Sequence, residues 1–136
     1  MRPSSKSWVR GFTMIEMVVV IALILVLLAI ALPMYQRAMV RAKEATLHSD
    51  LMTLNKVVQE YSQNKRRAPQ ALDDLVQAGY LKFIPNDITG RPDTWVTEME
   101  EQDKAWDPSQ PGIASVRSGS NEMSSDGSTP YSAWVK

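Results

Sequence analysis

The first third of the chain is dominated by one apolar run. From Phe12 to Leu32 the sequence carries a single charged side chain, Glu16. A helix of that length rises ~30 Å, about the thickness of one hydrocarbon core. The many β-branched residues are no obstacle, because in lipid a backbone must satisfy its own hydrogen bonds and a helix does so. The pattern predicts a membrane-spanning helix over residues 12–33.

Beyond Pro33 the pattern becomes amphipathic. Apolar residues recur at alternating spacings of four and three, which is typical of one face of a helix; they are Leu47, Leu51, Leu54, Val58 and Tyr61. The other positions hold polar or charged residues: Lys43, Glu44, Asp50, Asn55, Lys56 and Glu60. Because the stripe lasts only about two heptads, packing on the chain's own C-terminal domain is favoured over a coiled-coil dimer. We expect one helix from Phe12 to about Asn64, kinked at Pro33.

Turn residues and short periodic segments fill the rest of the chain. The basic run 65–67 followed by Pro69 ends the long helix and indicates a solvated loop rather than a phosphate-binding patch. A short helix is predicted over 70–78, with Gly79 ending it in the left-handed conformation. Tyr80 and Leu81 are expected to return to the core. Strands over 94–99 and 113–117 predict a small antiparallel sheet across the helix.

The predicted fold class is therefore α+β, with a long N-terminal helix packed against a small antiparallel sheet. Four segments follow from the patterns: 1–11 before the span, 12–33 within it, 34–64 as its amphipathic continuation, and 65–136 as a small globular domain. Lys+Arg and Asp+Glu both number 15, so no global basic field points to nucleic acid as a partner. Cysteine is absent, which excludes disulfides and thiolate chemistry.

No catalytic constellation can be assembled from these residues, and we expect no enzymatic activity. His48 is the only histidine, and it lies on the long helix without an acid–base partner. The adjacent Asp73 and Asp74 point in different directions on a helix, so a helix-surface role is expected. The tryptophans beyond the span are interpreted as core or lid residues of the small domain: Trp95, Trp106 and Trp134.

Three interpretations compete for the apolar run and its carboxylate. A secretory signal peptide would be cut after Ala29-Ile30-Ala31, but the run is overlong and Glu16 interrupts it. A plain membrane anchor does not need Glu16 and would be penalised by it. In the third interpretation, Glu16 pairs with a cation of a partner molecule, because a buried charge is tolerable when it is paired.

The stretch GFTMIE, residues 11–16, follows a short basic leader and resembles the cleavage motif of type IV prepilins and pseudopilins. The resemblance implies that a prepilin peptidase cuts between Gly11 and Phe12 and that Phe12 is then N-methylated. It also implies that Glu16 pairs with the methylated amine of a neighbouring subunit during filament growth. Pro33 stands where the family has a helix-kinking proline, with Tyr35 close by.

The C-terminal part is similar to the major (G-type) pseudopilin of type II secretion systems, over residues 72–92 and the Gly/Ser-rich end at 118–134. This resemblance implies a structural subunit of a pseudopilus that helps to export folded proteins. Its partners would be further copies of itself, minor pseudopilins, the inner-membrane assembly platform with its ATPase, and the secretin.

Basic residues flank the span equally on both sides, so the resemblance, not the charge count, indicates the topology. It implies a leader over 1–11, a cytoplasmic N-terminus, a single pass through the inner membrane, and a periplasmic domain over 65–136.

Calcium is the one cofactor that the resemblance implies. Major pseudopilins commonly bind calcium in the C-terminal loop. In this sequence the best candidate ligand there is Asp126, and Asn121 and Glu122 are candidates for further ligands. Calcium takes six to eight oxygens, and this loop offers few carboxylates. The alternative is closure of the loop by Ser, Thr and backbone hydrogen bonds alone.

Two other functions stay open at this point. A type IV pilin or a competence-type pseudopilin would share the same N-terminal motif, although the chain lacks the C-terminal cysteine pair of many pilins. A membrane-anchored enzyme or binding module that kept a prepilin-like leader is a more distant alternative.

Overall fold

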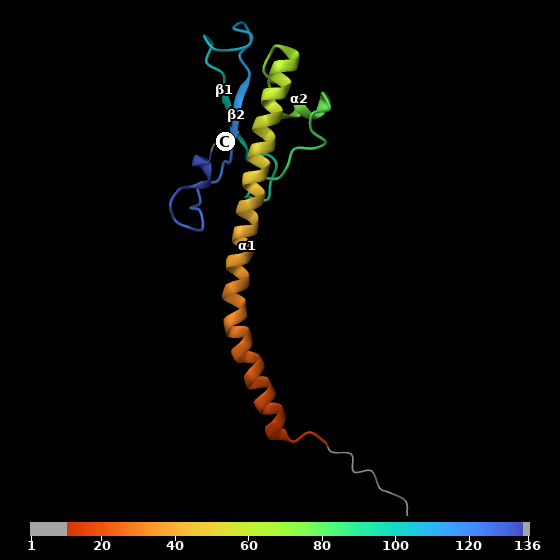
Figure 1. Ribbon diagram of the computed structural model, residues 1–136, viewed down its shortest axis with the longest axis vertical. Helices are drawn as coiled ribbons and strands as arrows, with labels where there is room; N and C mark the ends of the chain where they lie inside the picture. The colour runs from red at the N-terminus through yellow and green to blue at the C-terminus, as the bar shows by residue number, and fades with distance from the viewer. Residues whose placement is uncertain (1–10, 135–136) are drawn as a thin grey trace, which may run out of the picture. The chain divides into compact units, whose positions relative to one another are not determined.

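The computed structural model describes residues 11–134. Its elements are, in chain order, α1 (Met14–Lys65), α2 (Leu72–Gln77), β1 (Val96–Met99), β2 (Ile113–Arg117) and a 3-10 turn, η1 (Tyr131–Ala133) (Figure 1). A long helix packed against a two-stranded antiparallel sheet confirms the predicted α+β class. The leader predicted before Gly11 lies outside the described residues. The chain divides into two compact units, one ending at Ala38 and one beginning at Met39.

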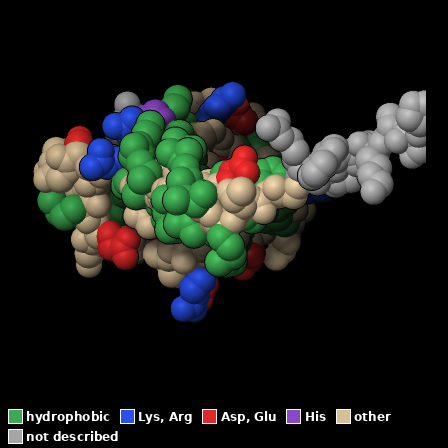
Figure 2. All heavy atoms as spheres, turned by 90° about the horizontal axis from the view of Figure 1, so that it is seen from below, with side chains coloured by type: hydrophobic (Ala, Val, Ile, Leu, Met, Phe, Trp, Pro, Cys, Tyr) green, Lys and Arg blue, Asp and Glu red, His purple; other side chains and the backbone are tan. Residues whose placement is uncertain are grey.

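The first unit contains the N-terminal part of α1, and its described residues, 11–38, form no core of their own. All its described side chains are exposed, although nearly all of them are apolar. Hydrophobic side chains lie open on the face seen from below (Figure 2). By length and composition, α1 contains a segment able to cross a membrane. Pro33 lies inside α1, which continues on both sides of it.

The second unit has the core that the amphipathic stripe predicted. All five stripe residues are buried, so the expectation of intramolecular packing is confirmed. The stripe packs with residues of the small domain, which are Leu75, Trp95, Ile113, Val116 and Tyr131. Within this unit, the sheet and α2 lie on different sides of α1 (Figure 1).

The sheet contacts the core through β2 alone. Ile113 and Val116 of β2 are buried, whereas every residue of β1 is exposed. The predicted first strand began at Thr94, two residues before β1. The start was wrong because residues 94 and 95 are bound to the preceding loop: the Trp95 indole donates to the Pro85 carbonyl at 2.8 Å, and the Thr94 hydroxyl lies 3.0 Å from an Asp87 carboxylate oxygen.

The short helix α2, Leu72–Gln77, is shorter than the predicted span of 70–78. The Asp74 carboxylate accepts hydrogen bonds from the backbone N–H groups of Gln70 (2.8 Å) and Ala71 (3.1 Å), which fixes the start of α2 at Leu72. Gly79 has a φ of +80°, so its predicted left-handed conformation is confirmed. The next two residues, Tyr80 and Leu81, pack against the core as expected.

Two side chains differ from their predicted surroundings. Trp106 is 45% exposed and the Arg66 guanidinium lies over its ring, so of the two predicted roles, core or lid, it does not have the core one. Asn55, placed among the polar positions outside the stripe, is 6% exposed. The other assignments hold: Trp95 is buried, Trp134 packs on the core, and the basic run 65–67 is exposed.

Candidate functional site

The predicted processing site lies at the start of α1. Gly11, Phe12 and Thr13 precede the helix in non-helical conformation. Phe12 is 75% exposed. The Thr13 hydroxyl oxygen accepts the backbone N–H of Glu16 at 3.2 Å. The Gly11–Phe12 peptide bond therefore lies in an open segment directly before a capped helix.

Glu16 lies in the first turn of α1, where the positive end of the helix dipole favours an anion. Its side chain is exposed, and within residues 11–134 it takes part in no ion pair. The carboxylate is thus available for a cation from outside the described chain. Surrounded by apolar side chains, it would need such a partner in a membrane or a helix bundle.

In the second unit, Asn55 joins α1 to β2. Its amide nitrogen donates to the carbonyls of Leu51 and Val116, both at 3.0 Å, and its amide oxygen accepts the Val116 N–H at 2.8 Å. One buried side chain therefore satisfies both backbone groups of Val116 in β2. Sequence reasoning missed this role because the partner lies 61 residues away.

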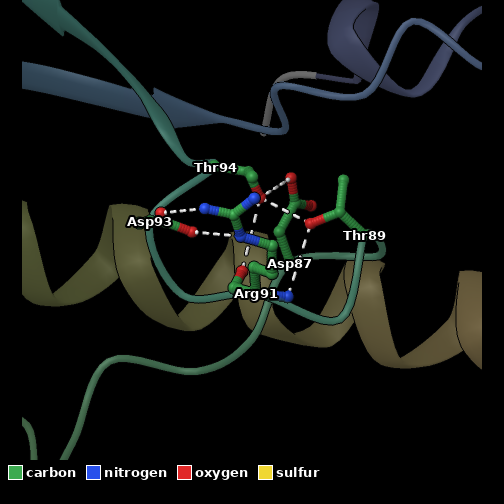
Figure 3. Close-up of polar contacts among 5 residues, drawn as sticks. All are labelled: Asp87, Thr89, Arg91, Asp93 and Thr94. Atoms are coloured by element: carbon green, nitrogen blue, oxygen red, sulfur yellow. Dashed lines mark hydrogen bonds and ion pairs between the residues drawn. The ribbon is translucent and has the colours of Figure 1, made fainter.

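A second buried polar group, Asp87, organises the loop before β1 (Figure 3). Asp87 is 3% exposed. One carboxylate oxygen accepts the Ser118 hydroxyl at 2.9 Å and the Gly119 N–H at 3.2 Å, and the other accepts the Ile88 N–H at 2.7 Å. The sequence identified Asp87 only as a turn residue.

The pair Arg91–Asp93 flanks this loop at the surface (Figure 3). The Arg91 guanidinium donates two hydrogen bonds to the Asp93 carboxylate, and the side-chain bond lowers the pKa of Asp93. Because both side chains are largely exposed, solvent screens the pair and its contribution to stability is small. The buried anchor of the loop is therefore Asp87, not this ion pair.

The C-terminal loop is tied to α1 through Glu44. The carboxylate accepts the backbone N–H of Ser125 at 2.5 Å, the Ser125 hydroxyl at 2.7 Å and the Tyr131 hydroxyl at 2.9 Å. Burial raises the pKa of Glu44, but these hydrogen bonds outweigh it, and the net pKa is lowered. Burial and the bond to Glu44 raise the pKa of Tyr131 to about 12.

Asp126 lies in the same loop, and one of its carboxylate oxygens, Oδ1, accepts hydrogen bonds from two serines. The Ser124 hydroxyl and both the N–H and hydroxyl of Ser128 donate to it. These bonds, that of Ser124 first, lower its pKa to about 2. Asn121 and Glu122 are exposed on the surface of the loop.

The C-terminal loop offers few ligands for a calcium ion. The described part of the chain contains no group of three or more His, Cys, Asp or Glu side chains placed to share a metal ion. The predicted ligands Asp126 and Asn121 therefore do not form a carboxylate-rich site with their neighbours. Hydrogen bonds from Ser and backbone groups close the loop, and a calcium site here is implied by the resemblance alone.

The remaining residues singled out in the sequence have ordinary surroundings. His48 is half-buried on α1, and Asp73 is exposed on α2. Asp74 caps the start of α2, a local structural role.

Comparison with protein families supports the interpretation of the N-terminal motif. Residues 9–32 match the model of the prokaryotic N-terminal methylation motif. Neither the comparison with curated proteins nor the comparison with solved structures finds a match. The motif, together with the apolar first part of α1, supports a type IV pilin-like protein. It implies processing by a prepilin peptidase and pilus-like assembly.

Proposed function

We propose that this chain is a structural subunit, the major pseudopilin, of a type II secretion pseudopilus. The observation that carries the proposal is the methylation motif at 9–32, which ends a basic leader and begins an apolar helix with a carboxylate in its first turn. The resemblance of residues 72–92 and 118–134 to G-type pseudopilins supports the finer assignment.

The contrast in burial along α1 agrees with a subunit that assembles through its helix. The first unit exposes an almost wholly apolar surface, and Glu16 lacks an ion-pair partner among the described residues. In the proposed filament, the neighbouring subunit supplies both: its helix covers the apolar surface, and its N-methylated Phe12 amine pairs with Glu16. Such pairing offsets the burial of the carboxylate only in the correct axial register.

The proposal includes partners and a location. The precursor is stored in the inner membrane with its N-terminus in the cytoplasm and its second unit in the periplasm. A prepilin peptidase cleaves it, and the assembly platform with its ATPase adds it to the filament. Minor pseudopilins and the secretin complete the machinery. The subunit catalyses no reaction and has no nucleic-acid partner.

The second candidate is a type IV pilin or competence-type pseudopilin, because the methylation motif is common to all of them. Genetic complementation separates the two. Expressed in a strain that lacks the major pseudopilin of its type II system, the chain should restore export of a folded protein. Expressed in a strain that lacks its major pilin, it should leave the cells without pili. Restored pili with unrestored export, from equal amounts of stable protein, would contradict the assignment.

A further inference from the structure

The start of α1 is fixed by one side chain, Thr13. Its hydroxyl oxygen accepts the Glu16 N–H and its carbonyl accepts the Met17 N–H, both at 3.2 Å, and the helix begins at Met14. Threonine is a favoured residue at a helix N-cap, and Thr followed three residues later by Glu is the capping-box sequence. Glu16 is therefore the third residue of a helix whose first residue is set by Thr13.

This boundary leaves the predicted cleavage point outside the helix. The Gly11–Phe12 peptide bond lies in exposed non-helical chain, and a side chain added at Gly11 would meet nothing within 4 Å. Proteolysis acts on segments that are open, in proportion to the fraction of molecules in the open form. The position of the helix start thus determines whether this bond is presented or protected.

A helix at a bilayer edge has two ways to respond when its cap is lost. Fraying inward would leave N–H groups unsatisfied in hydrocarbon, which is strongly unfavourable. Extension by one turn toward water satisfies those N–H groups instead, and it would take Phe12 and Gly11 into the helix. An N-cap residue has non-helical backbone angles, so a formed cap at Thr13 opposes this extension.

We propose that Thr13 is a positioning residue for precursor processing. By capping α1, it holds the Gly11–Phe12 bond in the exposed, non-helical form that the membrane peptidase cleaves. This inference rests on the proposed function, since it requires that a prepilin peptidase acts at this bond.

The test compares full-length precursors in liposomes with a purified prepilin peptidase. Thr13→Val keeps the shape and branching of threonine but has no cap acceptor, whereas Thr13→Ser and Thr13→Asn keep a cap acceptor and change the shape. Cleavage between Gly11 and Phe12 is followed by mass spectrometry and expressed as kcat/KM. We expect Ser and Asn variants to match the wild type and the Val variant to be about fivefold slower, which is about 1 kcal/mol. Hydrogen exchange at the Ile15 amide should slow in the Val variant only, because one added turn lets this N–H donate to the Gly11 carbonyl.

The other outcomes overturn either the capping role alone or the proposed function with it. Wild-type cleavage with an equally fast Val variant overturns the capping role alone. Rates that follow shape, with Val near the wild type and Asn slow, overturn it as well, because the peptidase would then contact the Thr13 side chain directly. A wild-type precursor that is not cut between Gly11 and Phe12 overturns the proposed function together with this inference.

Discussion

The two units of this chain differ in whether the apolar side chains of α1 are buried or exposed. In the second unit, leucines of α1 such as Leu51 and Leu54 are buried against β2 and α2, so this unit hides its own apolar surface. In the first unit, the apolar side chains of the same helix are all exposed. Burying such surface is favourable by ~25 cal/mol per Å², so the first unit requires a bilayer or neighbouring helices. One helix thus combines a self-sufficient half with a half that depends on its surroundings.

Glu16→Gln should have the strongest effect of the substitutions considered, and it should act on the first unit alone. The amide keeps the size of the side chain but removes the charge that, in the proposed filament, pairs with a neighbour's amine. We expect cleavage to proceed and the yield of sheared filaments to fall at least tenfold, while thermal unfolding of the second unit stays unchanged.

The matched control is Glu60→Gln, on the same helix, where the carboxylate makes only an exposed pair with Lys56. This variant should assemble normally. Equal filament yields from both variants would show that the charge of Glu16 has no role in assembly.

The next effect belongs to the second unit alone. Asn55→Ala removes both hydrogen bonds to Val116 and leaves a buried N–H and C=O unsatisfied, which should lower the free energy of unfolding by about 3 kcal/mol. Urea unfolding followed by tryptophan fluorescence measures this change. Asn64→Ala, which removes an exposed bond to Tyr80, should cost about 0.5 kcal/mol or less. A small loss of unfolding free energy in Asn55→Ala would mean that the hydrogen bonds between Asn55 and Val116 are dispensable.

A smaller effect is expected where the C-terminal loop meets α1. The pKa of Glu44 is lowered in the fold, so its contribution to stability is present above 4.5, its ordinary value, and is lost as the pH falls through the lowered value. The Ser125 amide resonance should report this titration in an NMR pH series, with a midpoint below 4.5 that disappears in Glu44→Gln. A midpoint at or above 4.5 would contradict the hydrogen-bonded geometry.

The smallest effect concerns calcium. Because Asp126 accepts hydrogen bonds from Ser124 and Ser128, we expect millimolar Ca²⁺ to shift the Tm of the full-length protein no more than Mg²⁺ does. A rise with Ca²⁺ alone, lost in Asp126→Asn, would establish the calcium site that the resemblance implies.

The sequence predicted the parts of this fold that depend on local patterns. The spacing of Leu47, Leu51 and Leu54 identified the buried face of α1, and Gly79 marked the end of α2, because helix period and backbone conformation are local properties. The sequence of residues 11–16 likewise predicted a prepilin-type N-terminus, and residues 9–32 match the prokaryotic N-terminal methylation motif.

The missed features depend on partners far away in the chain. Asn55 was assigned to the surface because polar residues usually lie there, and only β2 provides the backbone groups that it satisfies. The roles of Asp87 and Glu44 have the same origin, with partners 31 to 87 residues away. Trp106 lies outside the core because an aromatic ring in an acidic loop can pack against a cation, here Arg66, instead.

The central claim is that the first unit becomes functional only after a peptidase exposes a new amine beside Glu16. The mass of the protein purified from native membranes tests it most directly. We predict a chain that begins at Phe12 and carries one added methyl group on that residue. A chain that still begins at Met1 in assembled material would contradict the claim.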